Sequence, residues 1–263
     1  MNPESHTFQA AVDCHYLLHV PERPAGRPHS ALGRIGGPSL ESINGETAVD
    51  LGPIPERAIA IVAVHGYGMN AGVMLRLTAG MVGEDKLIAS LEGPNQFYST
   101  PNQPGSEIAF NWGTRAHWES AIRLHHEMLL RVLRELRQRF GVPPARSVVV
   151  GYSQPVGLNY RFAATHPEEV AGVVGICGGV PRDFEQRGYS RITAALLHIA
   201  REQDEFYPAE VAVSFPERLR KYADDVEFHL LPGTHRFPSK ARQVVQPWLE
   251  RIIARQPPAA GPV

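Results

Sequence analysis

The chain has 263 residues and a formal net charge of −1, with 43 % of its residues hydrophobic and 20 % charged. This length and apolar content fit one large domain or two small ones, and we expect a single domain over residues 1–263. Because the charge is near neutral, we expect no nucleic-acid partner and no stable anchoring on an anionic membrane.

The first 20 residues lack the basic stretch and long apolar core of a secretory signal. No run approaches the roughly 18 apolar residues that cross a bilayer. Cys14 and Cys177 lie far apart and show no metal-ligand spacing. We therefore expect a cytoplasmic protein with buried free thiols, and a disulfide between the two cysteines stays open at this point.

Apolar runs typical of strands begin early in the chain. The sequence predicts strands over 14–21, 58–66 and 86–94. The run over 58–66 is continuous and β-branched, which suits a central parallel strand covered on both faces. Residues 22–57 are rich in Pro, Gly and Ser and predict an insertion or a long loop. Residues 94–117 are predicted to form another loop.

A long amphipathic helix is predicted over 118–140, where apolar residues recur at helical spacing before Gly141. His125 falls on the apolar stripe of this helix, and His126 is its direct neighbour. Because adjacent residues do not share a helix face, we assign these two histidines no metal site. His125 is expected to be a core residue.

The remainder of the chain alternates between strands and helices. The predicted strands are 146–151, 170–179, 194–200 and 226–233, and the predicted helices are 156–166, 208–223 and 239–254. The tail over 256–263 is expected to be disordered. This alternation implies βαβ units, and hence an α/β fold with a mainly parallel central sheet flanked by helices.

The stretch Gly151-Tyr152-Ser153-Gln154-Pro155 forms a sharp corner between a predicted strand and a predicted helix. A serine hydroxyl becomes a useful nucleophile only with a base in reach and donors aimed at the oxyanion. The corner would raise the Ser153 hydroxyl above the sheet edge and place the Gln154 N–H at a helix N-terminus. Serine is also a preferred helix N-cap, so this motif alone leaves catalysis and capping equally open.

A candidate acid and a candidate base follow in the order that a serine triad on a parallel sheet requires. Asp204 comes after the strand 194–200, and His235 comes after the last predicted strand. Each has an ordinary explanation, because Asp204 could lie in a solvated loop and His235 is one of 12 histidines. The three residue types in this order, at strand ends that share one sheet edge, favour a triad with Ser153.

A second oxyanion donor is expected in the loop after the strand 58–66. The stretch "HGYG" contains Gly66 and Gly68, which free the backbone to turn its N–H groups inward. We choose the Tyr67 amide as this donor. The alternative is a Gly-rich turn that binds nothing.

Taken together, "HGYG", "GVPPARSVVVGYSQ", "GVVGICGGVP", the Asp-x-x-x-Pro spacing and "PGTHRFP" resemble the phospholipase/carboxylesterase family of α/β-hydrolases, over roughly residues 58–250. That group includes acyl-protein thioesterases and is related to dienelactone hydrolases. The resemblance implies an α/β-hydrolase fold without a large cap domain, and hydrolysis of carboxylic esters or thioesters through an acyl-enzyme without a metal or organic cofactor. It maps the nucleophile to Ser153, the acid to Asp204, the base to His235 and the oxyanion amides to Tyr67 and Gln154.

The sequence departs from the family at Pro155, where the family usually has glycine, and in the length of 22–57. The fixed φ of proline suits a helix start. The backbone N–H expected to bind the oxyanion belongs to Gln154, so proline at 155 does not remove it. The ring nevertheless fills space that glycine leaves empty and biases Gln154 away from helical geometry. We therefore expect either a slightly reshaped oxyanion site or a loss of activity.

The substrate is expected to be a small-molecule ester or thioester. Four apolar side chains in loops near the strand ends could line an acyl pocket or simply pack the loops, namely Met69, Tyr98, Trp112 and Phe206. Because the fold does not fix the reaction, two other functions stay open. One is another triad hydrolase (a peptidase, C–C hydrolase or perhydrolase), and the other is a non-catalytic binder, which Pro155 keeps under consideration. The sequence does not indicate the oligomeric state.

Overall fold

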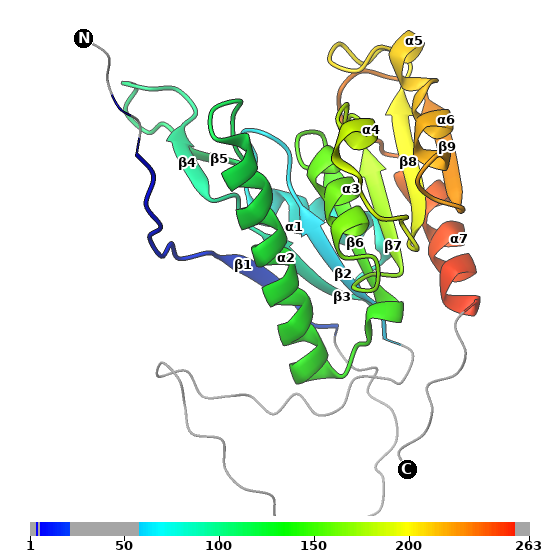
Figure 1. The fold of residues 1–263 in the computed structure, drawn as a ribbon. Coiled ribbons are helices and arrows are strands. Elements are labelled where there is room, and N and C mark those ends of the chain that lie inside the picture. The colour runs from blue at the N-terminus through cyan, green and yellow to red at the C-terminus, as the bar shows by residue number, and fades with distance from the viewer. Residues whose placement is uncertain (1–3, 5, 22–57, 256–263) are drawn as a thin grey trace, which may run out of the picture.

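A computed structural model describes residues 4, 6–21 and 58–255 (Figure 1). The expectations for 22–57 and 256–263 lie outside these residues. The centre is a seven-stranded sheet in the order β1-β3-β2-β6-β7-β8-β9. The edge strand β1 pairs antiparallel with β3, and the other neighbouring pairs are parallel. The mainly parallel sheet predicted from the sequence is therefore confirmed.

The strands of this sheet lie where continuous apolar runs occur. They are β1 (Tyr16–His19), β2 (Ala60–Val64), β3 (Leu87–Leu91), β6 (Ser147–Tyr152), β7 (Gly172–Ile176), β8 (Ala195–Arg201) and β9 (Val226–Leu231). Side chains alternate between the two faces of a strand. In β2, Val62 and Val64 join the core on one face, while Ile61 and Ala63 join the core on the other. Both faces are covered, which is why the run is apolar at every position.

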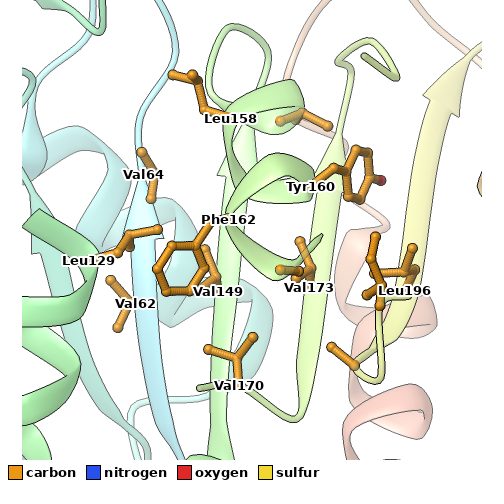
Figure 2. Packing of buried hydrophobic residues seen from close by; sticks show 14 of the residues in the cluster. Val62, Val64, Leu129, Val149, Leu158, Tyr160, Phe162, Val170, Val173 and Leu196 are labelled. Carbon is orange, nitrogen blue, oxygen red and sulfur yellow. The ribbon is translucent and has the colours of Figure 1, made fainter. Parts of the chain in front are cut away.

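Helices cover both faces of the sheet (Figure 1). One face carries α1 (Ala71–Val82) and α7 (Ala241–Ala254), and the other carries α2 (Trp118–Phe140), α3 (Val156–Thr165), α4 (Phe184–Arg187), α5 (Ala209–Ala212) and α6 (Phe215–Arg220). Figure 2 shows how Leu129 of α2 and Phe162 of α3 pack against the strand residues Val62 and Val149. This packing fixes α3, and with it the corner that precedes α3.

The helix predicted over 118–140 is confirmed to the residue. It ends at Gly141, which adopts a left-handed conformation with φ 67° and donates its N–H to Arg137 O. His125 and His126 are both buried, as expected for His125. His125 Nε2 lies 3.0 Å from Asn159 Oδ1 and so links α2 to α3.

Three local expectations were incomplete or wrong. The predicted loop 94–117 contains a two-stranded antiparallel hairpin, β4 (Asn95–Tyr98) and β5 (Ile108–Asn111). The helix α1 was not predicted. The helix expected over 208–223 is divided into α5 and α6, because Pro216 lacks the N–H that a continuous helix would need there and lies instead in the first turn of α6.

Within residues 58–255, the longer helices α1, α2, α3 and α7 pack on the faces of the sheet. The other segments that follow the parallel strands are loops, the hairpin and short helices, and none builds a large cap over the sheet edge. The fold class is that of an α/β-hydrolase. None of the helices in the described residues is both long enough and apolar enough to cross a membrane.

Candidate active site

Ser153 stands at the tip of a tight turn between β6 and α3. Its φ of 63° lies in the left-handed region, which non-glycine residues seldom adopt. The turn is held because Ser153 N donates to Ile176 O of β7 at 2.8 Å. Gly151 allows the close approach of α3, since a Cβ there would lie 2.3 Å from Asn159 Nδ2. Strained turns of this kind raise a side chain above the carboxyl edge of a sheet.

His235 reaches the serine from the loop after β9. Its Nε2 lies 2.8 Å from Ser153 Oγ. The backbone of His235 is held on both sides, because its N–H donates to Glu205 Oε2 at 3.0 Å and its carbonyl accepts from the Tyr152 hydroxyl at 3.1 Å. These two bonds fix the backbone from which the imidazole projects toward Ser153.

Asp204 lies in the loop after β8 and is buried. Its Oδ2 and Oδ1 lie 2.8 and 3.0 Å from His235 Nδ1. Oδ1 also accepts the backbone N–H groups of Phe206 and Tyr207, both at 2.9 Å. A buried carboxylate with this many donors is well compensated. With Nδ1–H donated to the carboxylate, the lone pair of His235 Nε2 faces Ser153 Oγ.

The structure thus brings together the three side chains that the sequence selected, from the ends of β6, β8 and β9. These strands lie on one side of the sheet in the order β6-β7-β8-β9. The arrangement can remove a proton from a serine hydroxyl and hold the resulting imidazolium against a carboxylate.

The two amides chosen as oxyanion donors also lie next to each other in the fold. Tyr67 follows β2 and Gln154 follows β6, and these strands are neighbours with Val64 opposite Gly151. In the part of the chain that the structure describes, neither amide donates a hydrogen bond. Both residues line the same pocket as Ser153. Two free N–H groups beside a candidate nucleophile are suited to binding a negative oxygen.

His65 supports the first of these loops, a feature that the sequence analysis missed. It is fully buried, accepts Gly93 N–H on Nε2 at 2.8 Å and donates from Nδ1 to Gly66 O at 2.8 Å. Burial lowers the pKa of this imidazole, so it stays neutral in its fixed tautomer. Its position directly before Gly66 in the "HGYG" stretch was the only available sequence signal.

Pro155 lies immediately before α3, with φ −77° and ψ −7°. This is helical geometry, as expected for a proline at a helix start. Its carbonyl accepts Asn159 N–H at 2.8 Å, so the helical hydrogen bonds begin at the proline. With the proline ring in place, Ser153 Oγ lies 2.8 Å from His235 Nε2, and the effect of Pro155 on activity stays a prediction.

A pocket of about 530 Å³ opens at Ser153. Its lining residues come from several loops and from α2 and α3, namely Tyr67, Trp118, Ser153, Gln154, Gly157, Arg161, Gly179, Val180, Pro181, Phe206, Tyr207 and His235. Most of the wall is apolar. Arg161 contributes a charged group, which is paired with Asp183.

Of the four side chains expected in an acyl pocket, Phe206 lines this one. It is 68 % exposed, and its ring lies 4.7 Å from that of His235. The other three lie elsewhere. Tyr98 lies on β4 at the surface, Met69 bridges to Phe110, and Trp112 is only 1 % exposed. The sequence analysis missed Trp118 and Tyr207, which reach the pocket only because α2 and the loop after Asp204 pack there.

The two cysteines are both free. Cys177 is buried as expected, but Cys14 is exposed, which corrects the expectation of two buried thiols. Among the residues described, no three His, Cys, Asp or Glu side chains cluster in a way that could hold a metal ion.

Comparison with known proteins decides the family. The model of the phospholipase/carboxylesterase family matches residues 48–253. The chain belongs to this family. As a member of the phospholipase/carboxylesterase family it is an enzyme, a hydrolase of the carboxylesterase type.

Solved structures share the fold of this family member at low sequence identity. The carboxylesterase of Bacillus cereus is 17 % identical with a TM-score of 0.59, and the match covers 76 % of this chain and 91 % of that one. SOBER1 of Arabidopsis thaliana is 16 % identical with a TM-score of 0.59, covering 74 % and 99 %. A phospholipase/carboxylesterase of Dyadobacter fermentans is 17 % identical with a TM-score of 0.57, covering 76 % and 94 %. A comparison with curated protein sequences finds no match.

Proposed function

We propose that this family member hydrolyses carboxylic esters or thioesters through a Ser153–His235–Asp204 triad and an acyl-enzyme. The observation that carries the proposal is the unbroken hydrogen-bonded chain from Asp204 through His235 to Ser153 Oγ. Family membership supports the reaction type, and the free amides of Tyr67 and Gln154 support the oxyanion site.

In the acylation step, His235 Nε2 takes the proton of Ser153 as Oγ attacks the substrate carbonyl carbon. The carbonyl oxygen becomes an oxyanion that the amides of Tyr67 and Gln154 bind. The bond to the alcohol or thiol then breaks, and the leaving group departs with the proton from His235. Water repeats the sequence on the acyl-enzyme and releases the acid. Asp204 stays ionised throughout and stabilises the imidazolium.

The pocket indicates the kind of substrate. Apart from Arg161 and the reacting groups, its walls are formed largely by apolar side chains such as Trp118, Val180 and Phe206. Such a surface favours an uncharged ester with an apolar acyl or alcohol group. We propose a small-molecule ester or thioester, and retain the expectations of a cytoplasmic single-domain enzyme without a nucleic-acid or membrane partner as predictions.

A panel of p-nitrophenyl esters of increasing acyl length, beside thioesters and aminoacyl amides, tests the proposal. We expect the wild-type chain to turn over esters and Ser153→Ala to lose this activity by at least about 10³-fold. Ester turnover retained within a few-fold in Ser153→Ala would reject the assigned nucleophile. Preferential turnover of amides would point to another triad reaction. Tight ligand binding without labelling of Ser153 by a fluorophosphonate would point to a binder.

A further inference from the structure

Trp112 touches both loops that carry the proposed oxyanion amides. It directly follows β5 and is 1 % exposed. Its indole Nε1–H donates to His65 O at 2.8 Å, and its backbone N–H donates to Gln154 Oε1 at 3.0 Å. One buried residue is therefore bonded to the loop after β2 and to the corner after β6.

The first loop is held on both sides of Tyr67. On the side of β2, the indole of Trp112 holds His65 O. On the side of α1, Gly68 N–H donates to Phe110 O at 2.9 Å, and Phe110 N–H donates to Met69 O at 3.1 Å. The residues next to Tyr67 are thus fixed by β5 and by the residue that follows β5.

The second loop is held through the side chain of Gln154. Besides accepting from Trp112 N–H, the Gln154 amide donates from Nε2 to Gly113 O at 2.8 Å. Two hydrogen bonds to consecutive residues fix both ends of this side-chain amide. Because the side chain and the backbone N–H belong to one residue, they restrict the direction in which the Gln154 N–H points.

We propose that Trp112 is a positioning residue that holds the Tyr67 and Gln154 amides in register with each other, an inference that rests on the proposed function. An oxyanion site lowers a barrier only if its donors are already aligned when the charge develops. The ester carbonyl of the bound substrate depends far less on this alignment. Loss of a bond made by Trp112 should therefore lower kcat and leave KM nearly unchanged.

The decisive variant is Trp112→Phe, which keeps an aromatic ring but removes the Nε1–H. We expect kcat for the best ester to fall roughly 10-fold, below the 10² to 10³ lost with a whole donor, and KM to stay within about two-fold. A trifluoromethyl ketone adds to Ser153 Oγ to give a tetrahedral oxyanion, with the serine proton passing to His235. Its affinity should fall by a similar factor, because it binds like the transition state.

Trp248→Phe is the matched control. Trp248 of α7 is also 1 % exposed, and its Nε1 has no hydrogen-bond partner among the described residues. The same substitution there removes a buried indole N–H far from the oxyanion loops. We expect kcat and the ketone affinity to stay within about two-fold of wild type, while thermal stability reports any loss of packing in both variants.

Gln154→Met is the second test, because it removes the bonds to Trp112 and Gly113 but keeps the backbone N–H of residue 154. It should show the same selective loss of kcat. If Trp112→Phe does not fold, wild-type kcat and ketone affinity in Gln154→Met overturn the inference. A folded Trp112→Phe protein with wild-type kcat and ketone affinity, or with a raised KM alone, overturns the inference while Ser153-dependent turnover stands. If Ser153→Ala keeps full activity, the proposed function itself fails, and the inference fails with it.

Discussion

The Asp204 carboxylate satisfies donors from two directions. Oδ1 accepts the amides of Phe206 and Tyr207, while the His235 Nδ1–H approaches both oxygens. The three donors therefore require a group at this position that only accepts hydrogen bonds, and they also fix its orientation. A neutral amide of the same shape cannot serve all three donors.

This geometry predicts the effect of Asp204→Asn. The amides of Phe206 and Tyr207 require an acceptor, so the asparagine oxygen faces them and its NH₂ group faces His235 Nδ1. The imidazole must then carry its proton on Nε2 and cannot accept the proton of Ser153. We expect kcat for ester hydrolysis to fall roughly 10⁴-fold with little change in KM.

The control for this substitution is Glu202→Gln, which neutralises an exposed carboxylate two residues away. In steady-state measurements, the kcat values of the two variants should differ by orders of magnitude. An Asp204→Asn enzyme with more than about a tenth of wild-type kcat would remove Asp204 from the mechanism.

Pro155 is the second residue whose role can be decided by one substitution. It is buried and already has helical φ and ψ, so glycine can adopt its conformation without strain. Glycine adds freedom to the unfolded chain and leaves a small void. We expect Pro155→Gly to lower the free energy of unfolding by roughly 1–2 kcal/mol and to keep kcat/KM within about three-fold.

Urea denaturation and ester kinetics on Pro155→Gly measure the two quantities separately. Turnover that appears only in the glycine variant would mean that the natural corner is not a competent esterase site. In that case the non-catalytic binder becomes the better interpretation of the fold.

At the scale of the elements, α1 starts where the loop that carries Tyr67 ends. The Asn70 side chain accepts Val73 N–H at 2.9 Å, and Glu92 Oε2 accepts Ala71 N–H at 3.0 Å. Two of the free N–H groups in the first turn are thus satisfied by side chains. The start of the helix is consequently held by Asn70 and by Glu92, which follows β3.

Loss of this cap predicts a moderate change in stability. Asn70→Ala should lower the free energy of unfolding by about 1 kcal/mol, because Val73 N–H loses its acceptor. Gln103→Ala, in the exposed turn between β4 and β5, provides a comparison without a helix cap. Equal unfolding midpoints in urea for Asn70→Ala and the wild type would show that the cap contributes nothing.

At the scale of the whole molecule, three buried imidazoles make the free energy of unfolding depend on pH. Burial lowers the pKa of His125 and His198 to about 3, and burial lowers the pKa of His126 to about 4. The unfolded chain therefore binds protons first as the pH falls below about 6.5. The stabilising effect of the neutral imidazoles is complete above that pH and declines as the pH falls toward 3.

The free energy of unfolding should accordingly fall with decreasing pH below about 6.5, with each buried imidazole adding roughly 1 kcal/mol per pH unit. Chemical denaturation between pH 7 and 4 measures this slope. His198→Leu should reduce the slope by one bound proton, whatever its effect on the absolute free energy of unfolding. A slope that is the same in His198→Leu and wild type would contradict this assignment.

The elements that the sequence missed lacked a clear local pattern. In α1, Val73, Leu75 and Leu77 are half-buried beside the fully buried Met74, so apolar residues surround much of the helix and blur its periodicity. Asn70 and Gly83 at its ends were usable signals. The hairpin β4–β5 has short, partly polar strands whose pairing depends on contacts with distant residues such as Met69.

The sequence by itself determined the parallel sheet, the long helix over 118–140 and the choice of Ser153, Asp204 and His235. Each of these follows from local patterns, since apolar runs form strands and parallel strands end at one edge. Tertiary structure alone decided that Phe206 lines the pocket while Trp112 lies buried between two loops. Both are aromatic residues in loops, and only the packing of segments far apart in the chain distinguishes a pocket wall from a buried support.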